Sequence, residues 1–323
     1  MECGIGAVYH RSRMPESDVA HDLFLYWLRE KYARGFAVKE RGGVILASDG
    51  DFTLAAAVRS LVPLEDARWD AARERLEAQI AEGLPARIAL WVPAGAPLPA
   101  EEPAASEFAE RVRQAAVKLG PHERAHVSLP VRLLLRKNNS TGGVISATGG
   151  LNPHWARFTG RVQGTFDLDS TALHRLPESE EHLEKLIELI VTVAAEMTDG
   201  EVREIETIDA WTLQRLSGDA GCTIIGLPRE AADDMGLAVR RNFRRLLLGT
   251  VPELRAAVAD VRALLVVGYY PRVEMEGATT ALRGYDPASY SGLDFVCLAT
   301  DGVVKPLIQA PDRLLPWANP TSA

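Results

Sequence analysis

The segment from Val127 to Asp169 constrains the fold most, because strand-forming residues, turn residues and clustered polar side chains coincide there. Two glycine pairs, Gly142-Gly143 and Gly149-Gly150, separate its runs of β-forming residues. Such punctuation is typical of antiparallel strands joined by tight turns. We therefore predict a mixed α/β fold, or an α+β fold, with a central, predominantly antiparallel sheet and flanking helices.

Apolar periodicity predicts the remaining elements. The strongest helix is expected over residues 178–197, where Leu183, Leu186, Ile187 and Ile190 lie on one stripe and Ser179 can cap the first turn. Further helices are expected at 15–32, 52–61, 67–80, 106–119, 210–216 and 229–248. Short apolar runs predict strands at 3–9, 87–92, 202–207, 222–227, 263–270 and 293–299.

The length of 323 residues favours two domains over one. The stretch from Pro93 to Pro103 is rich in Pro, Ala and Gly, as linkers are. We therefore predict a smaller N-terminal α/β part over residues 1–100 and a C-terminal α/β part over residues 101–323, built around the strands in 127–169. The alternative is a single domain in which 93–103 is a surface loop.

Composition indicates a globular protein of the cytoplasm. Hydrophobic residues make up 47% of the chain and charged residues 25%, which is the globular average. The cysteines Cys3, Cys222 and Cys297 are far apart and form no CxxC pair, so neither a disulfide framework nor a zinc ribbon is expected. No signal peptide and no membrane-spanning run is visible. The net charge of −8 does not favour nucleic acid as a partner of the whole molecule.

Local basic clusters nevertheless point to a phosphate-bearing partner. Trp155 and Phe158 alternate with Arg157 and Arg161, a pattern that can stack single-stranded bases. The candidate nucleic-acid-binding residues are Arg132, Arg136, Lys137, Trp155, Arg157, Arg161, Arg240, Arg241, Arg244 and Arg245. We predict that they contact the backbone of a single-stranded nucleic acid. The alternative is that these arginines pair with the many glutamates and that the aromatic residues are core.

Other clusters have weaker ligand signals. Asp167 and Asp169 would share one face of a strand, which suits a divalent cation and equally suits a solvated face. His122 and His126 have the spacing of a helical metal pair, but Pro121 precedes them and a strand follows. Residues 140–143 could form a nest for an anion or a plain hairpin loop. We expect no metal and no cofactor.

Two short stretches resemble known families. The opening Met1–Gly6 resembles the Cys-Gly-Ile start of class II glutamine amidotransferases, which implies a nucleophilic cysteine. Cys3 lies behind Glu2, however, and the glutamine-holding motifs have no counterpart, so the residues favour a buried strand. Asp294 and Lys305 resemble part of a restriction-type nuclease core, but Val303 stands where that family has a carboxylate. We therefore assign no family.

Two further classes of function stay open. A small-molecule-binding enzyme could have its site near the loop 271–292, which Tyr269, Tyr270, Tyr285 and Tyr290 bracket. A non-catalytic subunit of a larger assembly, with other protein subunits as partners, is favoured by the lack of a catalytic motif.

Overall fold

The structure, a computed structural model, describes residues 16–61, 66–93, 96–177, 179–226, 237–267 and 285–318. The strand expected over 3–9 with Cys3, the start of the helix expected over 229–248, and most of the loop 271–292 with Tyr269 and Tyr270 lie outside these residues. No helix in the described ranges is long and apolar enough to cross a membrane.

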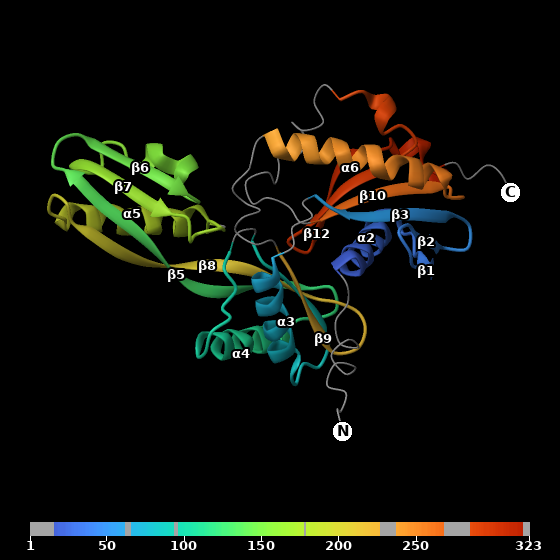
Figure 1. Ribbon diagram of the computed structural model, residues 1–323, viewed down its shortest axis with the longest axis horizontal. Helices are drawn as coiled ribbons and strands as arrows, with labels where there is room; N and C mark the ends of the chain where they lie inside the picture. The colour runs from blue at the N-terminus through green and yellow to red at the C-terminus, as the bar shows by residue number, and fades with distance from the viewer. Residues whose placement is uncertain are drawn as a thin grey trace. The chain divides into compact units, whose positions relative to one another are not determined.

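The chain forms two compact units (Figure 1). The first contains Met1–Ala125 and Thr212–Ala323, and the second contains His126–Trp211. The predicted division at residue 100 differs from this grouping, which places residues on both sides of that position in one unit. The long strands β5 (Arg124–Asn139) and β8 (Val202–Arg215) cross the boundary between the units in sequence.

The first unit contains a six-stranded mixed sheet with the order β1-β2-β3-β10-β11-β12. Its strands are β1 (Ala37–Glu40), β2 (Ile45–Ser48), β3 (Thr53–Ser60), β10 (Val261–Val267), β11 (Phe295–Thr300) and β12 (Val303–Gln309). The central strand β10 runs parallel to β3 and β11, and the remaining pairs are antiparallel. Such central parallel strands are normally buried on both faces.

Two helices, α2 (Glu16–Tyr32) and α6 (Leu237–Ala256), cover opposite faces of this sheet (Figure 1). Leu265 of β10 packs in one core cluster with Phe24 of α2. Leu264, the preceding residue, packs in a second cluster with Phe243 of α6. This alternation explains why β10 is apolar from Ala263 to Val267, since both of its faces are buried there.

The first unit also holds one end of a second sheet, whose full order is β6-β7-β5-β8-β4-β9. Here β4 (Arg87–Trp91) is antiparallel to β8 and parallel to β9 (Gly221–Ile225). Helix α3 (Ala67–Ala81) packs against β9 and against α4 (Ala104–Val117). Short 3-10 turns complete the described part of this unit: η3 (Pro287–Ser289), η4 (Asp312–Leu314) and η5 (Pro316–Ala318).

The second unit is a two-layer arrangement of strands and one helix. The strands are β6 (Gly143–Gly149), β7 (Gly164–Ser170) and most of β5 and β8. Helix α5 (Glu180–Glu196) and the turn η1 (Asn152–Arg157) lie on one side of these strands. The apolar stripe predicted along α5, from Leu183 to Met197, packs on the inward residues of β5, β6 and β7. Ser179 caps the helix by accepting a hydrogen bond from the His182 N–H.

The mixed α/β class is confirmed, but the tight turns predicted at the two glycine pairs are wrong. The turn at Gly142-Gly143 does not join paired strands, because β7 lies between β5 and β6 and runs parallel to β6. The second glycine pair allows a close approach instead of a hairpin. A Cβ on Gly149 would lie 2.3 Å from the carbonyl carbon of Ser170, and a Cβ on Gly150 would lie 2.2 Å from the carbonyl oxygen of Leu173.

Two helices expected from local propensity are strands. Residues 53–60 form β3, and residues 210–215 continue β8. The run Leu54–Val58 is alanine-rich, which favours a helix locally. In the fold, Ala56 packs in the core cluster on the α2 side and Ala57 in the cluster on the α6 side, so tertiary packing overrides the propensity.

Candidate functional site

Three of the predicted nucleic-acid-binding arginines form ion pairs within the second unit. Arg132 lies 3.0 Å from Glu204 and 3.8 Å from Glu206. Arg157 pairs with Glu180 and Glu184, and Arg161 pairs with Glu184 and Glu188, all on α5 or at its start. Trp155 of η1 is 52% exposed. The glutamates therefore offset much of the positive charge that the sequence places in this region.

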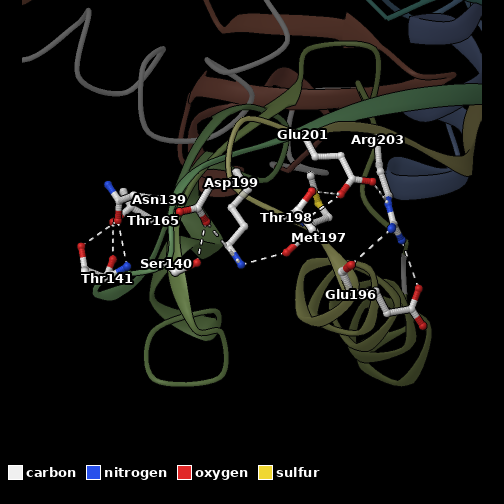
Figure 2. A network of polar contacts seen from close by, with 11 residues as sticks. Asn139, Ser140, Thr141, Thr165, Glu196, Met197, Thr198, Asp199, Glu201 and Arg203 are labelled. Carbon is white, nitrogen blue, oxygen red and sulfur yellow. Dashed lines mark hydrogen bonds and ion pairs between the residues drawn. The ribbon is translucent and has the colours of Figure 1, made fainter.

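Lys137 lies on the covered face of β5, opposite to Arg132 and Arg136, as strand alternation requires. It is 8% exposed, and its Nζ donates to the carbonyl oxygen of Met197 at 2.8 Å. Its contacts with Met197 and Asp199 make it part of a polar network between the end of β5 and the turn between α5 and β8, and Figure 2 shows other members of this network. Through these contacts, Lys137 connects the end of β5 to the turn that follows α5.

The loop after β5 belongs to the same network (Figure 2). Ser140 donates a hydrogen bond to Asp199, which also lies 3.9 Å from the Lys137 Nζ. The backbone N–H of Thr141 donates to the side-chain oxygen of Asn139 at 3.0 Å. This contact is the Asx-turn of an ordinary loop, and it occupies an N–H group that an anion nest would need.

The arginines of α6 belong to the first unit and have separate environments. The guanidinium of Arg244 lies 4.9 Å from the centre of the Tyr285 ring, and Arg245 donates to Asn242 at 2.8 Å. Arg241 is exposed and has no hydrogen bond or ion pair within the described ranges. The side chain of Arg240 is outside the described part of the structure.

The uncovered side of the second unit carries a different group of polar residues. We call it the open sheet face, and it consists of exposed side chains of β5, β6, β7 and β8 that alternate with core residues. Its members are Val144, Ser146, Thr148, Asp167, Asp169, Arg132, Leu134, Arg136, Val202, Glu204 and Glu206. The prediction that Asp167 and Asp169 share one face, with Phe166 and Leu168 on the other, is confirmed.

Strand register places these side chains in two rows. Ser146 of β6 lies beside Asp167 of β7, and Asp167 lies opposite Arg136 of β5. In the next row, Thr148 lies beside Asp169, and Asp169 lies opposite Leu134. Side chains directly opposite each other across neighbouring strands have Cβ atoms about 5 Å apart. A guanidinium, two carboxylates and two hydroxyl groups therefore lie in neighbouring rows on the same side of the sheet.

These groups line a hollow of about 260 Å³. Its walls are formed by Leu134, Arg136, Ser146, Thr148, Asp167, Leu168, Asp169 and Val202. Leu134 is 42% exposed and Val202 49% exposed, so apolar surface borders the charged groups. Sequence reasoning missed Ser146 and Thr148. The only signal for them was their period-two spacing, which matches that of Asp167 and Asp169.

The hydrogen bonds of the hollow leave several groups available. Asp167 accepts one hydrogen bond from Asn138 at 2.9 Å on Oδ2. Asp169 accepts from the backbone N–H and the hydroxyl of Thr171 on Oδ1. The Arg136 side chain has no hydrogen bond or ion pair to any residue that the structure describes. One oxygen of each carboxylate and the whole guanidinium are therefore free to bind a ligand.

The other candidate ligand sets are not assembled. No group of three or more His, Cys, Asp or Glu residues in the described ranges could hold a metal ion. His122 stacks on Tyr26, with ring centres 4.1 Å apart, and its Nε2 lies 3.2 Å from the Ser217 hydroxyl. Asp294 accepts a hydrogen bond from the backbone N–H of Arg262, and burial raises its pKa. These side chains have structural partners.

A buried carboxylate that sequence reasoning also missed is Asp209 of β8, which is 1% exposed. It accepts hydrogen bonds from the backbone N–H groups of His174 and Arg175 and from the Trp211 indole, and it lies 3.1 Å from the His174 Nδ1. It fixes the loop after β7 to β8.

Comparison with known proteins adds no relative. No protein-family model, no curated protein and no solved structure matches the chain.

Proposed function

We propose that the chain is a small-molecule-binding protein and that its ligand is a small zwitterion with an ammonium and a carboxylate group. The proposed location is the hollow on the open sheet face. The observation that carries the proposal is that Arg136 and Asp167 lie opposite each other without an ion pair. Each can therefore bind the group of opposite charge on one ligand.

The guanidinium of Arg136 suits a carboxylate. Arginine presents parallel N–H donors that match the two oxygens of a carboxylate, and such charge-assisted pairs are stronger than neutral hydrogen bonds. Arg136 is exposed on the face and unpaired among the residues described, so binding a ligand there breaks no internal contact of this side chain.

The two aspartates suit an ammonium group. An ammonium has three donors and no acceptor. The free oxygens of Asp167 and Asp169, together with the Ser146 hydroxyl, could accept those donors. Leu134 and Val202 offer apolar contact to the carbon skeleton of the ligand. A volume of about 260 Å³ lies just below the usual range for drug-sized ligands, which favours a metabolite of amino-acid size.

The charge of the face argues against a phosphate chain there. Four carboxylates, on Asp167, Asp169, Glu204 and Glu206, face two guanidinium groups, on Arg132 and Arg136. A surplus of acidic groups repels the phosphate backbone. The free, buried thiols of Cys222 and Cys297 support a cytoplasmic setting, which we include in the proposal.

A thermal-shift screen with the standard free α-amino acids tests this function. A ligand that binds the folded state alone stabilises it and raises the melting temperature, by an amount that grows with the ratio of ligand concentration to Kd. We expect one group of free amino acids to raise it, while the N-acetyl and carboxamide forms of the same compounds, each lacking one charge, give much smaller shifts. A screen without any shift, or equal shifts for the neutralised forms, contradicts the proposal.

Single-stranded nucleic acid is a second candidate ligand, and the exposure of Trp155 favours it. At 52% exposure on a short turn, this indole can stack on a base. Arg157, two residues further, is held by Glu180 and Glu184, so the phosphate contacts would need to displace those ion pairs. We therefore rank this candidate below the zwitterion.

A further inference from the structure

Strand β6 is an edge of its sheet and has no charged residue, proline or bulge that would oppose pairing. It lies at the end of the strand order and pairs with β7 alone. Its seven residues, Gly143–Gly149, contain no charged residue and no proline. Edge strands that stay monomeric are normally shortened, charged, bulged, interrupted by proline or covered.

The backbone of β6 makes few hydrogen bonds besides those of the ladder with β7. Within the described ranges, its hydrogen bonds outside the β6–β7 ladder run from the Gly160 N–H to the carbonyl oxygen of Gly143 and from the Ser170 hydroxyl to the carbonyl oxygen of Thr148. Val144 on this strand is 43% exposed. The middle of the strand therefore offers its outer backbone groups and side chains to a partner.

Each of the other edge strands described carries one of the protective features. β1 is four residues long, contains Lys39 and Glu40, and has a register irregularity between Val38 and Glu40. β12 contains Lys305 and Pro306 and pairs with an irregular register. On β9, the Ile224 N–H donates to the buried Glu77 of α3 at 2.8 Å. The contrast singles out β6.

We propose that β6 pairs antiparallel with β6 of a second copy of this chain, about a two-fold axis near Ser146. In that register Val144 lies opposite Thr148 of the partner subunit, and two β-branched side chains cover each other. Ser146 lies opposite Ser146 of the partner subunit. The pairing joins two sheets into one continuous sheet and uses main-chain groups that have no other partner in the described structure.

Electrostatic repulsion does not oppose pairing with a second copy of the chain. The nearest like charges on the same face are Asp167 and Asp169 of β7. The two β7 strands would be separated by three strand spacings, about 14 Å. That distance exceeds the Debye length of about 8 Å at physiological ionic strength, so repulsion between the copies is screened. The inference rests on the backbone edge of β6 and not on the proposed ligand, although Ser146 and Thr148 of this strand also line the hollow.

Sedimentation of the full chain at several micromolar concentrations is the first test. We expect a species of twice the 35.2 kDa monomer mass for the wild type. Ser146→Lys sets two lysines against each other across the axis and should give a monomer. The matched control is Leu189→Lys on α5, where the side chain is 43% exposed, and it should stay dimeric. A monomeric wild type, or a dimer that survives Ser146→Lys, overturns the inference.

Disulfide cross-linking is a second test that does not depend on a destabilising charge. Cβ atoms across a two-fold axis lie near the separation that a disulfide needs. Ser146→Cys should form a covalent dimer under mild oxidation, beyond the level of wild type and of Leu189→Cys. Cross-linking no greater than in these controls contradicts the pairing. Binding of extended peptides by a monomeric wild type would also contradict it and would assign the edge to another chain.

Discussion

Arg136 and Asp167 lie directly opposite each other on the antiparallel strands β5 and β7, yet no ion pair joins them. Asp167 instead accepts a hydrogen bond from Asn138, and Arg136 is unpaired among the described residues. The neighbouring Arg132 is different, because it pairs with two glutamates of β8. Arg136 and Arg132 lie on the same face of β5. Arg136 can therefore be substituted to test ligand binding, with Arg132 as the control.

The buried imidazole of His21 should make stability depend on pH. His21 is fully buried on α2, and neither ring nitrogen has a hydrogen-bond partner. Burial, and secondarily the charge of Arg41, lowers its pKa to about 4. The ordinary pKa of an unfolded histidine is about 6.5. Between these two pKa values the unfolded chain binds more protons than the folded chain. The contribution of His21 to stability should therefore be fully present above pH 6.5 and be lost as the pH falls from 6.5 towards 4.

We expect this contribution to change the free energy of unfolding by up to about 1.4 kcal/mol per pH unit within that window. Urea unfolding of wild type and His21→Leu between pH 4.5 and 7, followed by circular dichroism, measures it. The difference between the two proteins should shift in favour of the variant as pH falls. A difference that stays constant across the window would show that His21 does not titrate as inferred.

Removing the Asp209 carboxylate should destabilise the second unit strongly. Asp209→Ala leaves two backbone N–H groups, the Trp211 indole N–H and the His174 ring without their acceptor. Each buried donor left unpaired costs about 1–3 kcal/mol, so the loss should be at least about 3 kcal/mol. Glu206→Ala, at an exposed ion pair, is the control and should cost less than about 1 kcal/mol. Equal losses in chemical denaturation would contradict this role.

Gly149 should tolerate no side chain. Its φ of +80° is unfavourable for other residues, and a Cβ would lie 2.3 Å from the backbone of Ser170. Gly160 has a similar φ of +76° but open space around a Cβ. We expect Gly160→Ala to cost roughly 1 kcal/mol from backbone strain alone, and Gly149→Ala to cost clearly more. Melting temperatures of the two variants measure this, and a Gly149→Ala variant no worse than Gly160→Ala would refute it.

If single-stranded nucleic acid binds, Trp155 should contribute the stacking energy. Trp155→Ala should then weaken binding of a single-stranded oligonucleotide by about 1–3 kcal/mol, with affinity falling steeply as salt rises. Fluorescence anisotropy at low and moderate salt measures both effects. No binding by wild type at low salt would eliminate this candidate.

The predictable part of the fold was the part governed by local periodicity. The α5 stripe and its Ser179 cap follow from helical spacing, and the single-faced pair Asp167 and Asp169 follows from strand alternation. The strand identity of residues 53–60 was not predictable in this way, since the burial of Ala56 and Ala57 on opposite faces is set by α2 and α6. Local sequence does not contain that information.

Some residues of the hollow could be predicted from the sequence, but their arrangement could not. Arg136 and Asp167 were both recognised as polar positions on strands, but their opposition depends on β7 lying between β5 and β6. That order follows from the parallel β6–β7 pair and the η1 connection, for which the glycine pairs gave a misleading hairpin signal. Strand order is a non-local property, so the arginines were assigned to a phosphate partner and Ser146 and Thr148 were missed.

The most direct test of the central claim is an isothermal titration of wild type, Arg136→Gln and Arg132→Gln with the free amino acid that gives the largest thermal shift. Loss of a charge-assisted hydrogen bond should weaken binding to Arg136→Gln roughly tenfold to a hundredfold. Arg132→Gln should bind as wild type does, because Arg132 does not line the hollow. Undiminished binding by Arg136→Gln, or an equal loss in both variants, would contradict the proposed ligand site.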